Sequence, residues 1–226
     1  MNIKNQKNPP IKFEMLMMAP ENTNSVLVSR GADCVVFDAW GRADAWRDML
    51  QERGLNLRAI YATHGHPDHI SAAPGLALDG GVDWFLSRDD NFLIRGANDF
   101  LDMFHLPHIA PDYKRPVPMP TGEVEILTGV KMQIIPSPGH TPGGVMFWFA
   151  EYKVLLVGDT IFQESIGRYD LPGGDAKQLF ESIRRLYDMN LADDVTVIHG
   201  HGMHTTIGWL RQNNPWFISS QNTERE

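Results

Sequence analysis

The segment THGHPDH, residues 63–69, constrains most strongly what this chain can fold into. It directly follows Leu57–Ala62, an apolar run that is typical of a β-strand. His64 and His66 are two residues apart, so in an extended segment both imidazoles point to the same side and can bind one metal ion. The sequence therefore predicts a strand whose end presents metal ligands.

The side chains in the second half of this segment, Asp68 and His69, are expected to point in a different direction from His64 and His66. Pro67 disfavours a helical backbone at His66, and Asp68 and His69 are expected to begin a helix that turns them toward a different point. Because these three imidazoles and one carboxylate point to two different places, they suit half of a two-metal site better than one tetrahedral ion.

Three further predicted strands end in short Gly- or Pro-containing turns that carry His or Asp. These strands and turns are Lys131–Ile135 before His140, Val154–Val157 before Asp159, and Val195–Ile198 before the group His199, His201 and His204. Asp159 follows four apolar residues and a glycine, where a charge is expected only if a cation lies beside it, and its two oxygens can bridge two metals. We expect one site at one edge of a scaffold of strands.

The remaining pattern alternates strands with helices. Further strands are predicted at 12–18, Ser25–Val28, Cys34–Phe37, Trp84–Leu86, Val124–Leu127 and Val145–Phe149. Helices are predicted at Ala43–Arg53, Ile70–Leu78 and Asp175–Tyr187, with one helix or a pair of helices at Asp89–Phe104 and a loop at Pro107–Pro120. Several neighbouring strands read as hairpins, which favours a layered α/β or α+β domain over a purely parallel sheet.

Length and composition indicate one domain. The 226 residues contain no repeat or linker, so we expect a loose tail over residues 1–10 and a single domain over residues 11–226. The lone cysteine, Cys34, lies in a strand-like run, where it is expected to be a core residue, and it fits a reducing compartment.

Charge and hydropathy restrict the partners. The net charge of −8 argues against nucleic acid. No apolar run approaches the length of a membrane span, and Glu14 interrupts the apolar run near the N-terminus, so neither a membrane anchor nor a signal peptide is expected. The expectation is a cytoplasmic protein that acts on a small molecule, and the sequence makes no prediction of its oligomeric state.

The motifs resemble those of the metallo-β-lactamase superfamily. THGHPDH resembles its T-H-x-H-x-D-H motif, and PGHTPG, GDT and GHG resemble its later ligand motifs, in matching order from about Ser25 to Asn214. The resemblance implies a four-layer αββα sandwich with metals at one edge.

The resemblance also implies a ligand set. One metal would take His64, His66 and His140, the other Asp68, His69 and His201, with Asp159 as the bridge. Asp68 and Asp159 are the residues expected to be catalytic. His199 stands where relatives often carry a proline and is expected to support the turn or to bind nothing, and His204 is expected at the rim.

Two longer stretches resemble the short bacterial glyoxalase II-like hydrolases, namely GDTIFQESIGRYDLPGGD and GHGMHTTIGWLRQNNPWF. This likeness implies hydrolysis of a thioester, S-2-hydroxyacylglutathione such as S-D-lactoylglutathione. Two divalent ions, expected to be zinc with iron or manganese as alternatives, would share a hydroxide that attacks the carbonyl. Arg168 is expected either to bind the glutathione moiety or to pair with Asp170.

Some features depart from the family pattern. Met203 replaces the usual proline, and the run Val36–Trp40 stands where relatives have a D-P-G turn, so Trp40 is expected in the core, with a pocket wall as the alternative. Other functions stay open: a mononuclear-iron persulfide dioxygenase, or a hydrolase of a lactone, another ester or a phosphodiester. A purely structural metal site is usually a closed set of four ligands, most of them cysteines. The His/Asp set of this chain therefore argues against metals that only stabilise the fold.

Overall fold

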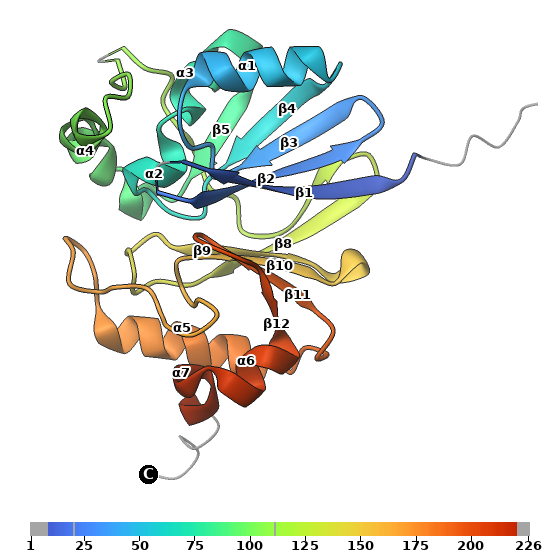
Figure 1. The fold of residues 1–226 in the computed structure, drawn as a ribbon, viewed down its shortest axis with the longest axis vertical. Helices are drawn as coiled ribbons and strands as arrows, with labels where there is room; N and C mark the ends of the chain where they lie inside the picture. The colour runs from blue at the N-terminus through green and yellow to red at the C-terminus, as the bar shows by residue number, and fades with distance from the viewer. Residues whose placement is uncertain (1–8, 20, 111, 221–226) are drawn as a thin grey trace, which may run out of the picture.

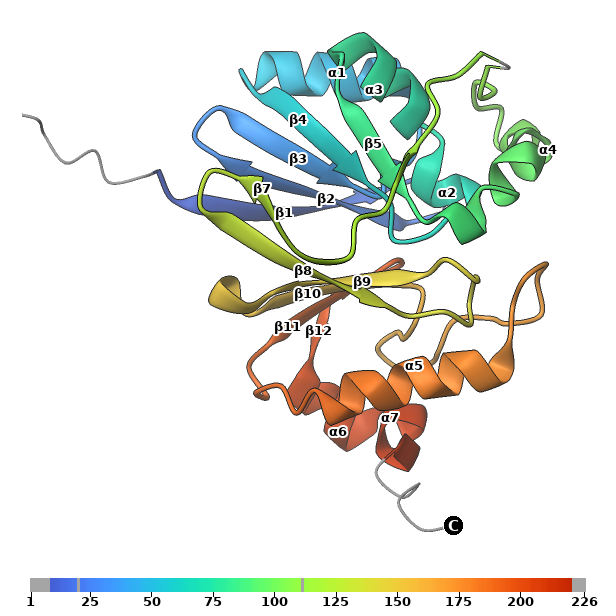
Figure 2. The ribbon, with the colours of Figure 1, turned by 180° about the vertical axis from the view of Figure 1, so that it is seen from behind.

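A computed structural model describes residues 9–19, 21–110 and 112–220. The chain forms four layers, in the order helices, sheet, sheet, helices, as Figures 1 and 2 show from opposite sides. This arrangement is the αββα sandwich that the sequence predicts. Each half of the chain builds one sheet and the helices that cover its outer face.

The first half supplies a mixed six-stranded sheet in sequential order. Its strands are β1 (Ile11–Met18), β2 (Thr23–Arg30), β3 (Asp33–Phe37), β4 (Asn56–Tyr61), β5 (Asp83–Leu86) and β6 (Val117–Pro118). Its helices are α1 (Ala43–Glu52), α2 (Pro67–Ile70), α3 (Ala73–Gly80), η1 (Arg88–Asp90), η2 (Leu93–Gly96) and α4 (Ala97–Met103).

The second half supplies the other six-stranded sheet. Its strands are β7 (Gly122–Leu127), β8 (Val130–Pro136), β9 (Val145–Phe149), β10 (Val154–Gly158), β11 (Thr196–His199) and β12 (Thr205–Thr206). Its helices are η3 (Ala150–Tyr152), α5 (Ala176–Asp188), α6 (Ile207–Asn213) and α7 (Pro215–Ser219).

Three apolar clusters hold the four layers together. Val28, Phe37 and Phe147 belong to the cluster between the two sheets. Trp46 belongs to the cluster under the helices of the first half, and Leu179 to the cluster under those of the second half. Because both faces of each sheet are covered, the site must form at an edge of the sheets.

The helix predicted over Ile70–Leu78 is two helices, α2 and α3. The amide of Ala72 donates to the carbonyl of Ala39 at 3.0 Å instead of to its own helix. Pro74 has no amide hydrogen to continue the helical ladder. The chain therefore turns between Ile70 and Ala73, and the prediction of one helix was wrong.

Three other regions differ from the sequence prediction. The segment predicted as helical over Asp89–Phe104 consists of the 3-10 helices η1 and η2 followed by α4. The loop predicted over Pro107–Pro120 contains the short strand β6, and β12, α6 and α7 follow the last predicted strand. The side chain of Asn214 caps α7 by accepting the amide of Phe217 at 3.0 Å. Phe217 is buried against the second sheet, and Trp209 and Trp216 pack beside it.

Trp40 and Cys34 are core residues. Both are fully buried in the cluster under the first helical layer, so Trp40 does not form a pocket wall. Burial of the Cys34 thiol, with the nearby charge of Asp33, raises its pKa to about 12.

We expect Cys34 to resist thiol reagents at pH 8, because its sulfur is both buried and protonated. Titration with a chromogenic disulfide should detect no free thiol in the native protein and one per chain in denaturant. A native thiol that reacts as fast as free cysteine would contradict this burial.

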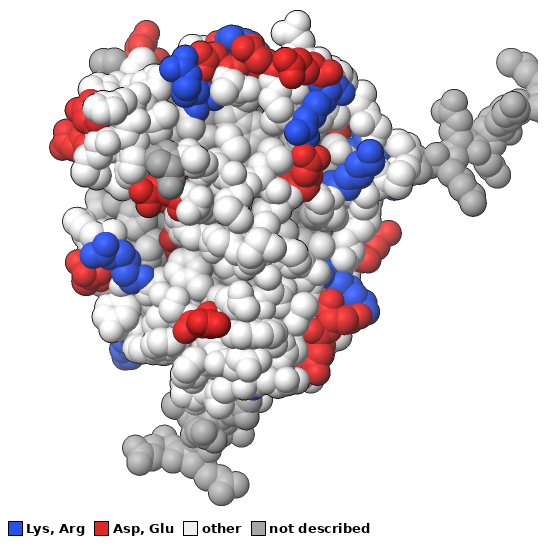
Figure 3. Space-filling model, viewed as in Figure 1, with Lys and Arg blue, Asp and Glu red and all other residues white. Residues whose placement is uncertain are grey.

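The surface is acidic and mixed. On the face shown in Figure 3, lysines and arginines stand beside acidic groups and form no extended basic patch. None of the helices within the described residues is long and apolar enough to cross a membrane. Residues 1–8 of the expected tail lie outside the described part of the chain.

Candidate metal centre

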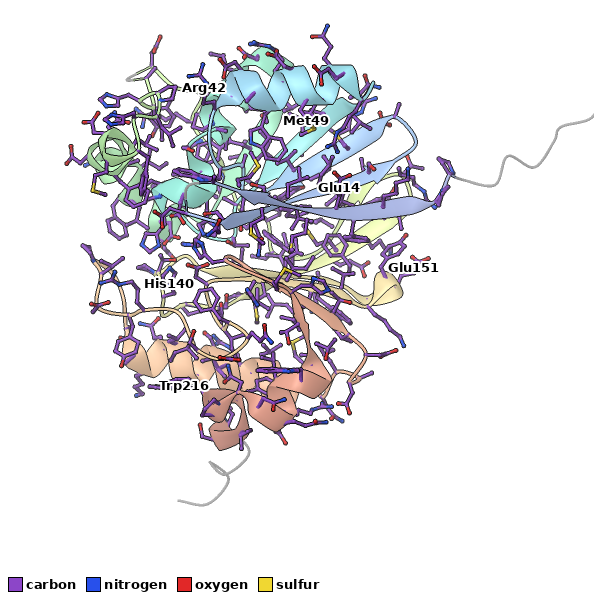
Figure 4. The ribbon with its side chains drawn as sticks, viewed as in Figure 1. Glu14, Arg42, Met49, His140, Glu151 and Trp216 are labelled. Carbon is purple, nitrogen blue, oxygen red and sulfur yellow. The ribbon has the colours of Figure 1, made fainter. Side chains whose placement is uncertain are left out.

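Four strand ends meet where the two sheets face each other at one edge. The loops after β4, β8, β10 and β11 carry the seven residues that the sequence singled out: His64, His66, Asp68, His69, His140, Asp159 and His201. Figure 4 shows His140 at the level of the boundary between the two halves of the molecule. The structure therefore brings all seven predicted ligands into one site.

Three histidines form the first cluster. His66 Nδ1 lies 3.1 Å from His64 Nε2 and 2.9 Å from His140 Nε2. The three nitrogens thus converge from two loops that lie far apart in the sequence, which is the arrangement of ligands around one cation.

Asp68, His69 and His201 form the second cluster. Asp68 and His69 enter it from the first turn of α2, since His66 is the N-cap of that helix. Asp68 Oδ2 lies 3.4 Å from His69 Nε2 and 3.3 Å from His201 Nε2. Because α2 begins at Pro67, the side chains of Asp68 and His69 point in a different direction from those of His64 and His66, as the sequence predicts.

Asp159 joins the two clusters. Its Oδ2 lies 3.5 Å from His140 Nε2 and 3.3 Å from His201 Nε2, and its Oδ1 lies 3.5 Å from His69 Nε2. Its carboxylate therefore faces ligands of both groups, which is the position that a bridging carboxylate requires.

Hydrogen bonds at the outer ring nitrogens orient three of the histidines. His64 Nδ1 lies 3.0 Å from Thr63 Oγ1, His140 Nδ1 lies 2.7 Å from the carbonyl of Arg168, and His201 Nδ1 lies 3.1 Å from the carbonyl of Glu21. A ring that donates through one nitrogen presents a lone pair at the other, so these contacts prepare the inner nitrogens to bind a cation.

Asp38 is a functional residue that the sequence analysis missed. It is buried, has a φ of 51°, and lies with Oδ2 3.0 Å from His69 Nδ1. Its carboxylate also accepts the amide of Thr63 at 2.6 Å and the Thr63 hydroxyl at 2.8 Å. The altered D-P-G turn retains this aspartate, and a buried charge directly after a strand was the signal that could have found it.

The electrostatics differ between the two clusters. Burial, reinforced by His69 and His140, holds the pKa of His64 well below its usual value, and burial with His140 lowers the pKa of His66 to about 4. These two imidazoles are neutral at pH 7, the form that binds metal.

The second cluster instead attracts positive charge. Burial alone would lower the pKa of His201, but Asp159 and Asp68 outweigh it and raise the pKa to about 11. Burial would raise the pKa of Asp159, but the charges of His69 and of its other histidine neighbours hold it far below the usual range. The carboxylates are therefore ionised at neutral pH.

The donor set fits divalent cations. His69 Nε2 and Asp159 Oδ1 are buried and make no hydrogen bond among the described residues. Unpartnered buried polar atoms are costly unless a ligand satisfies them. Imidazoles and carboxylates are donors for Zn²⁺, Fe²⁺ and Mn²⁺ alike, so the His/Asp clusters are compatible with a divalent metal site.

The sequence of this chain matches a known protein family over most of its length. Residues 18–201 match the metallo-beta-lactamase superfamily. The chain belongs to the metallo-β-lactamase superfamily. It is 38% identical over 189 residues to hydroxyacylglutathione hydrolase GloC of Haemophilus influenzae, covering 83% of this chain and 88% of that protein. It is a metallo-hydrolase of this superfamily.

Solved structures of the superfamily share the fold. BLEG-1, a B3 metallo-beta-lactamase, superposes with a TM-score of 0.80 at 29% identity, covering 91% of this chain and 99% of that chain. TTHA1623 in a di-iron-bound form superposes with a TM-score of 0.78 at 31% identity, covering 90% and 99% of the two chains. The superfamily sandwich therefore extends over almost all of this chain.

The other two histidines of the last motif of this metallo-β-lactamase fold lie away from the clusters. His199 is buried, and its carbonyl accepts Asn24 Nδ2 at 2.8 Å. His204 is exposed, as is Met203. Of the three histidines, the structure brings only His201 to the candidate ligands.

A cavity of about 550 Å³ opens beside the candidate ligands, with His66, Asp68 and His201 among its lining residues. Arg168 also lines it, and its guanidinium pairs with Asp170 through contacts of 2.8 and 3.0 Å. The expected ion pair with Asp170 is therefore present, and Arg168 also lies at the cavity, while its binding of glutathione stays a prediction.

Proposed function

We propose that the protein hydrolyses a thioester, S-2-hydroxyacylglutathione such as S-D-lactoylglutathione, with two divalent ions in the candidate centre. The observation that carries the proposal is the position of Asp159, whose carboxylate faces both candidate clusters and lines a cavity of small-molecule size. The likeness to GloC of H. influenzae supports the substrate class. Zinc is the proposed metal, and the di-iron form of TTHA1623 supports iron as the alternative.

The histidines and the aspartates of the candidate centre have different roles in the proposed reaction. Bound divalent cations would supply a water of lowered pKa and would polarise the thioester carbonyl. In the first cluster, His64 and His66 are neutral and present lone pairs. Asp68 and Asp159 stay ionised because neighbouring imidazoles outweigh the effect of burial on the pKa of each carboxyl, so they can accept hydrogen bonds from an attacking water.

Hydrolysis of S-D-lactoylglutathione by the purified protein, before and after treatment with a chelator, tests the proposal. Turnover should vanish with the metal and return when Zn²⁺, Fe²⁺ or Mn²⁺ is added back. Absence of turnover in protein with a full metal complement would overturn it, and oxygen consumption with glutathione persulfide would then identify the dioxygenase activity.

Replacing Arg168 with alanine should raise KM for S-D-lactoylglutathione about tenfold, because one charge-assisted contact to a substrate carboxylate is lost. The metal content should not change, since the guanidinium pairs with Asp170, and the contact of Arg168 with His140 is made by its backbone carbonyl, which alanine keeps. Steady-state kinetics with metal analysis measure both quantities. An unchanged KM would retire this role of Arg168.

A further inference from the structure

One side of the cavity beside the candidate ligands is apolar. Away from the histidines and aspartates, its lining includes Phe92, Leu93, Phe100, Leu171 and Pro172. The first three come from the helical segment after β5, and the last two come from the loop after β10. We call these five residues the apolar wall. It spans both halves of the molecule and continues directly to the candidate metal centre.

Apart from the candidate metal centre, the cavity offers little to a charged ligand. Among the described residues that line it, Arg168 is the one lysine or arginine, and Asp170 already pairs with it. Glu21 adds a negative charge at the lining. A substrate can therefore place at most one anionic group favourably, while the apolar wall stays available to hydrocarbon.

We infer that the apolar wall is an acyl-binding subsite that favours thioesters whose acyl group extends into hydrocarbon, with four or more carbons, over those with a short acyl group such as lactoyl. This inference rests on the proposed thioester hydrolysis. Glutathione, the thiol half of the proposed thioester, carries amides and charges along its length, whereas the acyl carbons beyond the carbonyl and a 2-hydroxyl are hydrocarbon. Burial against the wall removes these carbons from water without leaving a polar group unpaired.

Thioesters of one neutral thiol, N-acetylcysteamine, isolate the acyl group. With the metal-loaded protein, kcat/KM should rise about three- to fourfold for each methylene that the wall buries, from acetyl through butanoyl to hexanoyl. Phe100→Ala should flatten this rise. Met103→Ala is the matched control, because Met103 lies on the same helix α4, is exposed and does not line the cavity.

The outcomes separate the two proposals. A flat or falling series, with S-D-lactoylglutathione still hydrolysed, would overturn the acyl subsite and leave the proposed function standing. No hydrolysis of any thioester would overturn the proposed function itself. Phe100 also packs near Trp40 and Phe104, so Leu171→Ala, in a surface loop, provides a second variant that should flatten the series if Phe100→Ala fails to fold.

Asp90 is the last residue of η1. This side chain is fully buried. One carboxylate oxygen accepts the amide of Gly65 and the hydroxyl of Thr141, both at 2.8 Å, and the other accepts the amide of Gly143 at 2.7 Å. No basic side chain forms an ion pair with it among the described residues, so neutral donors alone stabilise this buried charge.

Both glycines around Asp90 are required for this contact. A Cβ atom at Gly65 would lie 2.8 Å from Asp90 Cβ, and one at Gly143 would lie 2.7 Å from Asp90 Cγ. Only residues without a side chain let both backbones approach the carboxylate closely enough to donate to it.

We propose that Asp90 is a positioning residue for the three-histidine cluster. Gly65 lies between His64 and His66, and Thr141 and Gly143 follow His140, so the Asp90 carboxylate ties together the two loops that supply these ligands. This tie holds His66 Nδ1 and His140 Nε2 at 2.9 Å from each other. Asp90 acts through the backbone and does not itself line the cavity.

Asp90→Asn tests whether the hydrogen bonds of Asp90 to the two loops position the ligands. An amide has only one accepting oxygen, so its NH₂ group must face the amide of either Gly65 or Gly143. The affinity for Zn²⁺, measured by competition with a chromogenic chelator, should fall about 10- to 100-fold. Asp89→Asn is the matched control, because Asp89 is the exposed neighbour of Asp90 on the same turn.

A loss of stability alone would not account for that result. The thermal midpoint of the metal-free variant and the visible spectrum of its Co²⁺ form report folding and ligand geometry separately. Thr141→Val removes one of the three hydrogen bonds and should weaken Zn²⁺ binding less. If neither variant binds Zn²⁺ more weakly than the Asp89→Asn control, the positioning role of Asp90 is overturned.

Discussion

Asp159→Asn should lower kcat/KM for thioester hydrolysis by at least about 10³-fold and reduce the metal bound per chain. The amide keeps the shape of the side chain but loses its charge. It also turns an NH₂ donor toward one of the two clusters that the carboxylate oxygens face at 3.3–3.5 Å. Elemental analysis and steady-state kinetics of the same preparation measure both effects.

The control for Asp159 is Asp194→Asn. Asp194 is an exposed aspartate paired with Lys153, and it lies outside the candidate centre. Its replacement should change neither metal content nor activity, since exposed ion pairs contribute little to stability. Full metal binding and full activity in Asp159→Asn would show that this carboxylate does not bridge the two clusters.

Gly200→Ala should have the second largest effect, although Gly200 carries no functional group. A Cβ atom there would lie 1.8 Å from Asp159 Oδ1 and 2.8 Å from His69 Cε1, which is far closer than real Cβ contacts. Either the turn or the ligands must shift. We expect the free energy of unfolding to fall by about 1–3 kcal/mol and metal binding to be largely lost.

Gly202→Ala separates steric overlap from backbone strain. Gly202 has a φ of 78°, and a Cβ atom there would meet nothing within 4 Å. Its replacement should cost only the left-handed strain of roughly 1 kcal/mol and should leave metal binding intact. Equal loss of metal in both variants, measured by elemental analysis and chemical denaturation, would contradict the steric argument.

The ligand motifs were predictable because each is local. Two positions along an extended segment set the common direction of His64 and His66, and the helix that begins at Pro67 turns Asp68 and His69 away from them. A strand followed by a Gly- or Pro-containing turn is also a short-range signal, and it located the loops of His140, Asp159 and His201. The order of these motifs carried the resemblance from which the αββα sandwich followed.

Predictions of secondary structure were wrong where long-range contacts decide. The break between α2 and α3 depends on the Ala39 carbonyl, from a different loop, which accepts the Ala72 amide. The last two helices are short, and their aromatic residues become a buried face only against the second sheet. Hydrophobic periodicity over so few residues is a weak signal.

The residues that support the ligands could not be read from spacing. Asp38 and Asp90 lie outside every ligand motif, and their functional contacts run to backbone amides and rings of other loops. A buried carboxylate becomes meaningful only when its donors are known. The same holds for the apolar wall, whose residues come from two segments on different halves of the chain.

The sequence by itself determined which side chains can bind metal and in which groups they point together, because strand and helix geometry act over a few residues. Only the tertiary structure decided that the groups meet. His201 is held by the Glu21 carbonyl, and Asn24 donates to the carbonyls of His199 and Gly202 on either side of it. The start of β2 thus holds the last ligand loop in place, because buried polar groups must find partners wherever the packed sheets bring them.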